Sequence, residues 1–436
     1  MPGYPQGFFR LPELEATQRD LLLKLQNDLY KHPLKSPDQR DAILKHLQET
    51  YTKTYPDLEP GLLGKLFSDV TDDYLLLQSL LELQSDPAVN SVTVNSYDRV
   101  TLVRNGKVEG ARFHFEGKNQ VLRLIELLFA QGSHSLDYSE PVQEMRLQDG
   151  SRLTVLLPPV AVDGPSLVLK KPPAHTFSAG YLVRNNTLSS EVLQFLQACV
   201  AARMNIIISG LKASGKTTLL NALAAFIPQQ ERVITIEDPV ELSFTHPHNL
   251  RLETKPGSTY GTGAVQQANL LGKAIRLSPD RLVVGEIKGD EVCQIIKALC
   301  SGQEGFLSTV NAHHPYDTLN RLESLCLVAE PSSPVQSIRE QLAAAIDLVV
   351  HVACLKNDVF RVTSVAEVSG IAGGNIVLSE IFKFTQTGTT AQGAPAGTLV
   401  PTGTRPLFNS RLETAGFLFG PEIYGSSLGD VLPRKH

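Results

Sequence analysis

The feature that most constrains this chain is a glycine-rich loop at residues 210–217, with the sequence Gly-Leu-Lys-Ala-Ser-Gly-Lys-Thr. It matches the pattern G-x4-G-K-[ST] and lies between an apolar run at 205–209 and a helical pattern at 216–226. Its two glycines let several backbone N–H groups turn toward one point, where the helix N-terminus adds partial positive charge. The sequence therefore predicts a strand, a phosphate-binding loop and a helix, in that order.

We expect this loop to bind ATP together with Mg²⁺. Lys216 would reach the β- and γ-phosphates, and the hydroxyl of Thr217 would bind the magnesium ion. The alternative is a chance match, and the strand and helix patterns on either side of the loop argue against it. The predicted ATP-binding residues of the loop are Gly210, Leu211, Lys212, Ala213, Ser214, Gly215, Lys216, Thr217 and Thr218.

Two carboxylates follow apolar runs and are candidates for the chemistry. Glu237 ends the run at 233–236, and Glu286 follows the run at 282–284. In parallel α/β sheets ligands bind at the carboxyl ends of the strands, so both acids would lie at the edge that carries the loop. We expect Glu286 to hold Mg²⁺ through water or to orient the attacking water, and Glu237 to polarise that water. The alternative for each is a solvated acid at a strand end.

Short apolar runs alternate with helical patterns through the second half of the chain. Such alternation is typical of a mostly parallel sheet with helices on its faces, so the predicted fold class is α/β. The apolar runs lie at 205–209, 233–236, 282–284 and 348–352, and the helical patterns at 216–226, 290–299, 318–328 and 335–345.

The first half of the chain has a different pattern. Leucines at helical spacing (Leu14, Leu21, Leu22, Leu25 and Leu29) predict a helix, and Ser36-Pro37 is placed to begin a second one that carries Ile43, Leu44 and Leu47. A helix at 74–83 is then followed by strand patterns at 91–95, 100–103, 152–157 and 167–171, with Asn105-Gly106 as a hairpin turn and a helix at 121–129.

Composition marks the boundaries between these parts. The stretch 172–180 is rich in turn residues, and the segment TQTGTTAQGAPAGTLVPTGT after Phe384 is rich in Gly, Thr and Ala without an apolar period, so we expect a linker and a flexible segment there. The predicted organisation is a helical appendage at 1–70, a smaller α+β lobe at 71–171, a linker at 172–184, the α/β core at 185–384, and a flexible segment with a C-terminal tail at 385–436.

Charge and composition argue against several classes of function. The 40 Lys and Arg and 45 Asp and Glu give a formal net charge of −5, and Trp is absent, so nucleic acid is not an expected partner. The longest apolar stretch, 343–355, is interrupted by Asp347 and His351, so we expect no insertion into a membrane. Five Cys without a CxxC pair favour reduced thiols in a cytoplasmic protein. The pairs His246/His248 and His313/His314 lack partners at ligand spacing, so no further metal is expected.

Four segments together resemble the secretion ATPase superfamily of type II and type IV systems. GLKASGKTT is similar to its Walker A motif, ERVITIEDPVEL to its Asp box, SPDRLVVGEIKGDE to its Walker B motif and GQEGFLSTVNAHHP to its His box. A narrower likeness, to the ATPase of Tad/Flp pilus assembly, is carried by LPPVAVDGPSLVL, LVRNNTLSSEVLQFLQACVAARMNIIISG, HNLRLETKP, SIREQLAAAIDLVV and RVTSVAEVSG. The resemblance covers about residues 74–384.

The resemblance implies a homohexameric motor with a RecA-like core, in which ATP lies between an N-terminal lobe and that core. It implies a location at the cytoplasmic face of the membrane, where the motor acts on an integral platform protein of a pilus or secretion system. In that family basic residues of the N-terminal lobe reach the phosphates, and the matching positions here are Arg146 and Arg152. From the residues alone, these two arginines flank a turn at 148–151 and would be the solvated rim of a hairpin.

The sequence departs from the family pattern at several positions. Gln303 and Asn311 replace the histidines of the His box, Lys288 replaces an arginine of the Walker B segment, and Gly272 stands where an arginine is expected. Lys212 and Ala213 are unusual in the glycine-rich loop, whereas Lys216, Thr217, Glu237 and Glu286 match. Three functions therefore stay open: an ATP-hydrolysing motor for pilus assembly or secretion, a scaffold that binds ATP and hydrolyses it slowly or not at all, and a RecA-like nucleic-acid motor.

Overall fold

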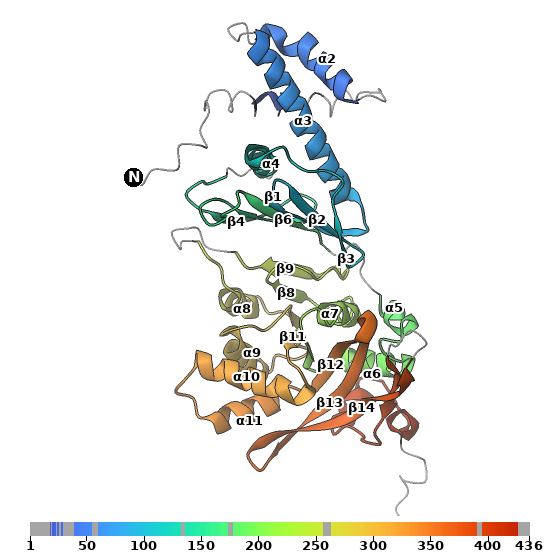
Figure 1. Cartoon of the computed structure of the whole chain (residues 1–436). Helices are drawn as coiled ribbons and strands as arrows, with labels where there is room; N and C mark the ends of the chain where they lie inside the picture. The colour runs from blue at the N-terminus through green and yellow to red at the C-terminus, as the bar shows by residue number, and fades with distance from the viewer. Residues whose placement is uncertain are drawn as a thin grey trace, which may run out of the picture. The chain divides into compact units, whose positions relative to one another are not determined.

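The computed structural model describes residues 39–54, 60–131, 136–172, 178–255, 263–389 and 395–425, with residues 18, 20–22, 24, 25 and 28 of an earlier helix. The chain divides into two compact units, residues 1–174 and 175–436 (Figure 1). The division falls inside the segment 172–184 that the sequence suggested as a linker. Part of that segment is helical, because α5 (Ala179–Arg184) begins after Ser178, whose Oγ accepts a hydrogen bond from the Tyr181 N–H.

The first unit contains a six-stranded antiparallel sheet in the order β3-β2-β1-β6-β5-β4. Alternate residues of β5 and β6 are buried, as expected for strands with one face on a core. The predicted turn at Asn105-Gly106 is confirmed: both residues have positive φ, 50° and 78°, and they join β2 to β3. The strands are β1 (Val89–Ser96), β2 (Arg99–Arg104), β3 (Lys107–Gly110), β4 (Val142–Arg146), β5 (Arg152–Leu156) and β6 (Ser166–Lys170), of which β3 and β4 were not predicted.

The helices of the first unit are α2 (Gln39–Tyr51), α3 (Pro60–Ser85) and α4 (Lys118–Gln131), with a short 3-10 turn η1 (Thr52–Thr54). The expected helix at 74–83 is only the end of α3, which runs through the boundary we placed between residues 70 and 71. The appendage and the lobe therefore share one continuous helix. The buried carboxylate of Asp73 on α3 accepts hydrogen bonds from Gln120 and Arg123 of α4, which ties the two helices together. Leu14, Leu29, Ser36 and Pro37 lie outside the described residues.

The second unit contains a nine-stranded sheet in the order β15-β14-β13-β12-β7-β11-β10-β8-β9. Neighbouring strands from β12 to β9 are parallel, and β13, β14 and β15 add to the β12 side as antiparallel strands. This confirms the predicted α/β core with a mostly parallel sheet. The strands are β7 (Ile206–Gly210), β8 (Val233–Glu237), β9 (Asn249–Glu253), β10 (Arg281–Val284), β11 (Leu307–Asn311), β12 (Leu348–Leu355), β13 (Val359–Ala372), β14 (Asn375–Thr389) and β15 (Pro395–Pro401).

Helices cover both faces of this sheet (Figure 1). One apolar cluster joins α6 and α7 to one side of the central strands, and a second joins α8, α9, α10 and α11 to the other side. Consecutive residues of β7 alternate between the two, because Ile206 and Ile208 belong to the first cluster and Ile207 to the second. The helices are α6 (Ser190–Ala201), α7 (Lys216–Ala224), α8 (Gln267–Arg276), α9 (Glu291–Cys300), α10 (Pro315–Ala329) and α11 (Val335–Ala345).

The prediction of a flexible segment beyond residue 384 was wrong for the residues that the structure describes. β14 continues to Thr389 and pairs with β15, and α12 (Asn409–Thr414) and a 3-10 turn, η3 (Pro421–Tyr424), follow. Leu412 and Tyr424 are fully buried in the cluster that contains α6. The ring of Tyr424 lies edge-on to that of Phe195 on α6. These residues therefore belong to the packed core.

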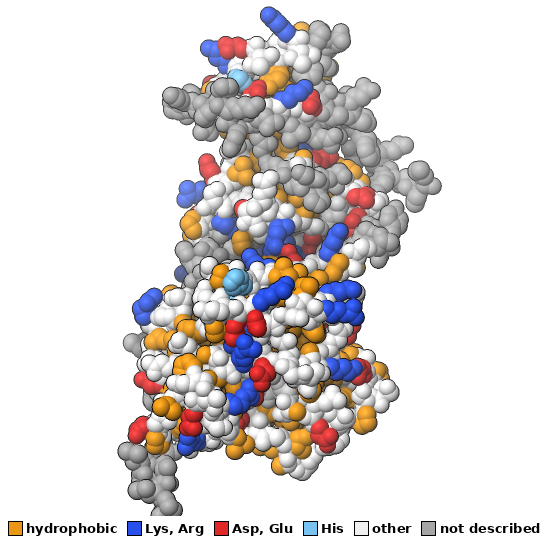
Figure 2. Space-filling model, turned by 180° about the vertical axis from the view of Figure 1, so that it is seen from behind, with side chains coloured by type: hydrophobic (Ala, Val, Ile, Leu, Met, Phe, Trp, Pro, Cys, Tyr) orange, Lys and Arg blue, Asp and Glu red, His pale blue; other side chains and the backbone are white. Residues whose placement is uncertain are grey.

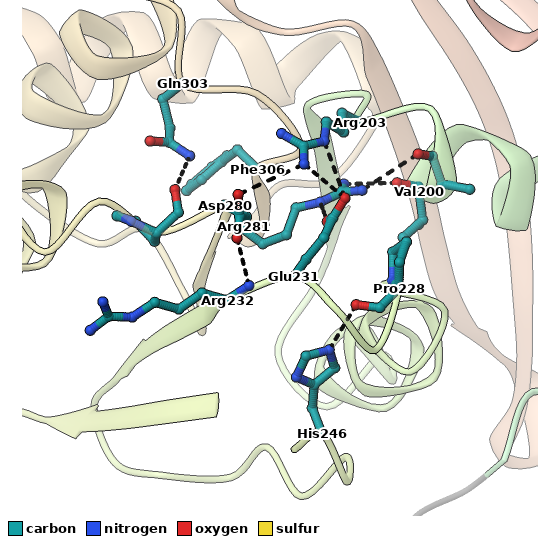
Figure 3. A network of polar contacts seen from close by, with 12 residues as sticks. Val200, Arg203, Pro228, Glu231, Arg232, His246, Asp280, Arg281, Gln303 and Phe306 are labelled. Carbon is teal, nitrogen blue, oxygen red and sulfur yellow. Dashed lines mark hydrogen bonds and ion pairs between the residues drawn. The ribbon is translucent and has the colours of Figure 1, made fainter. Parts of the chain in front are cut away.

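A polar network lies at the amino-terminal ends of the parallel strands, opposite the glycine-rich loop (Figure 3). The fully buried Arg281 at the start of β10 forms an ion pair with Glu231 and donates to the backbone carbonyl of Val200 at 2.8 Å. Arg203 also pairs with Glu231, at 2.9 Å. A side chain at Gly305 would collide with the Arg281 guanidinium, which explains a glycine before β11. The network fixes the start of β10 against the end of α6.

Candidate nucleotide-binding site

The glycine-rich loop joins β7 to α7, as the sequence predicted. Three of its residues have positive φ: Gly210 (156°), Ala213 (61°) and Gly215 (92°). A Cβ at Gly210 would collide with the backbone carbonyl oxygen of Val352 on the neighbouring strand β12, so only glycine fits there. Gly215 is the N-cap residue of α7, and no side chain caps this helix. The N-terminus of α7 is thus a place where an anion would meet the positive end of the helix dipole.

The side chain of Ser214 gives a second indication that this loop suits an anion. Its hydroxyl oxygen is buried and has no hydrogen-bond partner. A buried hydroxyl without a partner is costly, and a phosphate oxygen would satisfy it. Leu211, Lys212 and Ala213 form the exposed rim of the loop, and Thr217 and Thr218 lie half-buried in the first turn of α7. The residues of the loop therefore fit a polyphosphate.

Lys216 is the buried cation of the loop, with 8% of its surface exposed. Its Nζ donates to the backbone carbonyl of Leu211 at 2.7 Å and to Oδ1 of Asn311 at 2.7 Å. Burial lowers the pKa of Lys216, and the nearby carboxylate of Glu286 acts in the opposite direction. The ammonium group is thus held over the loop by two neutral oxygen atoms.

Asn311 connects Lys216 to Glu286. It is the last residue of β11, and its Nδ2 donates a hydrogen bond to Oε1 of Glu286, which follows β10. Nζ of Lys288 lies 4.0 Å from the other oxygen of Glu286. The structure therefore brings two of the predicted catalytic residues, Lys216 and Glu286, to one place at the carboxyl edge of the sheet. The sequence marked Asn311 only as a departure from a family pattern.

Glu237 ends β8, two strands along from β11 in the sheet, and is 1% exposed. Its Oε2 accepts hydrogen bonds from the backbone N–H groups of Glu241 and Leu242, both at 2.7 Å. Its Oε1 is buried without a partner. Burial raises the pKa of Glu237, and the two backbone donors partly offset this. The carboxylate thus supports the loop after β8 with one oxygen, and its other oxygen is buried and unpaired.

His351 and Ser209 form a buried pair beneath the loop that the sequence analysis missed. Nδ1 of His351 on β12 lies 2.9 Å from Oγ of Ser209, the residue before Gly210 on β7. Burial and the neighbouring His314 lower the pKa of His351 to about 4. The signal was a polar residue in each of two adjacent apolar strands, at positions that the register pairs. A neutral imidazole here supports the loop without placing a second cation beside Lys216.

Arg146 and Arg152, the remaining predicted ATP-binding residues, belong to the first unit. They are opposite one another on β4 and β5, and Arg152 forms an ion pair with Glu144. Pairing of Arg152 with a carboxylate agrees with the rim position that the residues alone suggested. A role in phosphate binding stays a prediction for both.

The departures from the family pattern lie in different places. Asn311 is at the site, and Nζ of Lys288 donates to the backbone carbonyl of Asp238 at 2.9 Å near it. Gln303 lies at the opposite edge of the sheet, where its Nε2 donates to the carbonyl of Pro279 at 3.3 Å (Figure 3). Gly272 lies in α8, where an added Cβ would be 3.4 Å from Gln294. Of the two His-box positions, only Asn311 touches predicted catalytic residues.

Of the histidine pairs considered as metal ligands, the ring of His246 has structural partners. His246 Nε2 lies 3.1 Å from the carbonyl of Pro228, and its Nδ1 accepts from the His248 N–H (Figure 3). Over the described ranges, no group of three or more His, Cys, Asp and Glu side chains is arranged to bind a metal ion. Within those same ranges, no helix combines the length and apolarity that crossing a membrane requires.

Comparison with known proteins finds one matching family and several similar proteins. The family described as "Type II/IV secretion system protein" matches residues 77–389. A protein of Mycobacterium tuberculosis named for conjugal transfer is 30% identical over 277 residues, which are 62% of this chain and 78% of that protein. Protein VirB11 of Agrobacterium fabrum is 29% identical over 306 residues, 63% of this chain and 88% of VirB11.

Solved structures of similar proteins include one ATPase and one motor protein with bound ADP. The VirB11 ATPase of the Brucella suis type IV secretion system, in complex with sulphate, is 24% identical, with a TM-score of 0.37 and coverage of 67% of this chain and 93% of that chain. The pilus retraction motor PilT with bound ADP is 18% identical, with a TM-score of 0.48 and coverage of 70% and 81%.

Proposed function

The chain belongs to the family of type II/IV secretion system proteins and is an ATPase, and from that premise we propose that it is the motor that drives pilus assembly or protein secretion. The observation that carries the proposal is the hydrogen-bonded series from Lys216 through Asn311 to Glu286. It supports the proposal because the ammonium that we propose binds phosphate lies close to a carboxylate that could orient water, as hydrolysis of a phosphoanhydride requires.

Within this site we propose that ATP binds with its phosphates on residues 210–218 and that Mg²⁺ is held by Thr217 and, through water, by Glu286. The supporting features are the unpartnered hydroxyl of Ser214, the uncapped N-terminus of α7 and the Lys216 ammonium. Magnesium would neutralise charge on the β- and γ-phosphates. We retain Glu237 as a residue that polarises water, and Arg146 and Arg152 as further phosphate ligands.

At a finer level we propose the ATPase of a Tad/Flp pilus assembly system. The segments that resemble this subfamily, such as 337–350 in α11 and β12, support this choice. The proposed assembly is a homohexamer in the cytoplasm, at the inner face of the membrane, and the proposed partner is an integral membrane platform protein. Neither nucleic acid nor direct membrane insertion is part of the proposal. On the face of the second unit seen in Figure 2, basic and acidic side chains are interspersed.

A scaffold that binds ATP without rapid turnover is the second candidate. The observation in its favour is Asn311, because a neutral amide with both ends engaged stands where the family has a histidine. Such a protein would dock on the same secretion machinery and respond to ATP binding alone.

Steady-state ATP turnover of the purified chain, measured beside binding of a non-hydrolysable ATP analogue and particle mass, separates the two. A motor should turn over ATP at about 1 per second or faster and form a ring with the analogue, with hexamer mass. Binding without turnover would favour the scaffold. A particle that stays monomeric at micromolar concentration with the analogue would contradict both the ring and the motor.

A further inference from the structure

Asn311 is the one uncharged side chain at the site described above that contacts both Lys216 and Glu286. Its Oδ1 accepts from Nζ of Lys216 at 2.7 Å, and its Nδ2 donates to Oε1 of Glu286. The residue is exposed at the end of β11, whereas the preceding four residues of that strand are buried. Its amide is therefore held by these two charged groups and not by packing.

We propose that Asn311 is a positioning residue whose amide acts as a latch on Lys216, and that ATP opens the latch by taking Lys216 away from it. The inference rests on the proposed function, because it concerns how the same site responds to ATP. The latch holds the ammonium of Lys216 toward Glu286. With ATP bound, Asn311 would stay bonded to Glu286 alone.

The chemistry of Lys216 explains why phosphate opens the latch. An ammonium group has three N–H donors, and two of them are given to the neutral oxygens of Leu211 and Asn311. Phosphate oxygens carry negative charge, so they attract the ammonium of Lys216 more strongly than the neutral oxygens of Leu211 and Asn311 do. ATP therefore displaces these oxygens, but each displaced bond reduces the apparent affinity for nucleotide.

The bond to Glu286 gives Asn311 its second role. Nothing in phosphate binding by Lys216 removes the donor Nδ2, so Asn311 continues to fix the orientation of the Glu286 carboxylate. Its Oδ1, which lay 2.7 Å from Nζ of Lys216, then becomes an acceptor beside the phosphate, where the attacking water must be held. The same side chain thus weakens ATP binding and speeds turnover.

These two effects have opposite signs in one variant, which makes the proposal testable. In Asn311→Ala we expect binding of a non-hydrolysable ATP analogue with Mg²⁺ to become about three- to tenfold tighter, the equivalent of one lost competing hydrogen bond. We expect kcat for ATP to fall about tenfold or more, because Glu286 is no longer oriented. A residue that only stabilises the fold would weaken both properties together.

Gln303→Ala is the matched control. Gln303 stands at the other substituted position of the same motif but bonds to Pro279 at the opposite edge of the sheet. The Gln303→Ala variant should bind the ATP analogue with the same affinity, and turn over ATP with the same kcat, as the unaltered chain. Asn311→Ser is the second variant, which replaces the amide by a side chain too short to bridge both partners and should show the same split if Asn311→Ala is poorly folded.

Unchanged or weaker analogue binding in both Asn311 variants would overturn the latch, and so would a split of the same size in Gln303→Ala. If the unaltered chain hydrolyses ATP slowly, the binding comparison alone decides. Failure of the unaltered chain to bind ATP would overturn the proposed function itself. If the unaltered chain binds the ATP analogue and Asn311→Ala binds it with the same affinity, only this inference is overturned.

Discussion

Charged groups at the carboxyl edge of the second unit are positioned mainly by neutral groups. Lys216 is held by a backbone carbonyl and an amide, Glu286 by the same amide, and Glu237 by two backbone N–H groups. His351 is buried next to the loop and neutral near pH 7, because its pKa is lowered to about 4. Lys216 is therefore the buried charge that the loop itself offers to an incoming polyphosphate.

Glu286→Gln should separate chemistry from binding. Glutamine keeps the size of the side chain and an oxygen that can accept from Asn311, but it removes the negative charge that would activate water. We expect kcat for ATP to fall about 100-fold or more while analogue binding changes less than about threefold. The control is Glu304→Gln, an exposed acid 3.8 Å from Arg411 at the other edge of the sheet. Equal loss of binding and turnover in Glu286→Gln would refute the assigned role.

His351 should make the stability of the second unit depend on pH. Its pKa is lowered from 6.5 to about 4 in the folded chain, so the unfolded chain takes up this proton first as the pH falls. Its contribution is therefore fully present above about pH 6.5 and is lost as the pH falls toward 4. Between pH 7 and pH 5 the loss should be about 2 kcal/mol of unfolding free energy.

The measurement is denaturant unfolding of the unaltered chain and of His351→Asn across this pH range. Asparagine retains an acceptor for the Ser209 hydroxyl and does not titrate. The difference between the two unfolding free energies should shrink or reverse on going from pH 7 to pH 5. If the plots of unfolding free energy against pH for the two proteins stay parallel, His351 does not titrate as described. The other titrating groups are common to both proteins and do not affect this comparison.

At the scale of elements, the sequence predicted the strand, loop and helix of the phosphate site, and the structure places them within two residues of the expected ends. This was possible because the apolar runs are strong and because the glycine-rich motif is associated with one backbone conformation. The antiparallel strands β13, β14 and β15 were missed. The end of β14 (385–389) and β15 lie in Thr- and Gly-rich sequence without an apolar period, and their pairing depends on contacts between strands, which local pattern does not contain.

Gly397 shows how such a strand is specified. A Cβ at this position of β15 would lie 2.6 Å from the ring of Phe384 and 2.9 Å from the backbone of Gln386 on β14. The strand pairs there only because the residue has no side chain. Composition suggested that this glycine belongs to a flexible segment. In the structure its lack of a side chain lets the two strands approach closely.

Gly397→Ala should destabilise the second unit by about 1–3 kcal/mol, because the added methyl forces β15 away from β14. The matched control is Gly388→Ala on β14, where an added Cβ meets nothing within 4 Å and φ is ordinary. Thermal unfolding of both variants tests this. Similar midpoints for the two variants would contradict the described pairing of β14 with β15.

At the scale of the whole molecule, the pattern of the sequence identified an α/β core and a separate α+β part, but not all of their limits. Helix α3 crosses the expected boundary at residue 70, and residues 395–425 pack into the core through Leu412 and Tyr424. Arg411 of α12 donates to Asp347 at 2.7 Å, just before β12. These contacts attach α12 to the amino-terminal ends of the parallel strands, opposite the site. The core of the second unit therefore includes this C-terminal segment as well as the central sheet.

Above all, we propose that the loop at 210–217 binds the phosphates of ATP through Lys216. The most direct test is calorimetric titration of the full chain with a non-hydrolysable ATP analogue and Mg²⁺, comparing Lys216→Ala with Lys212→Ala. Lys212 is an exposed lysine of the same loop, and its variant keeps the backbone N–H. We predict at least a tenfold loss of affinity in Lys216→Ala, with an unchanged circular dichroism spectrum, and less than a threefold loss in Lys212→Ala. Equal affinity in Lys216→Ala and the unaltered chain would contradict the claim.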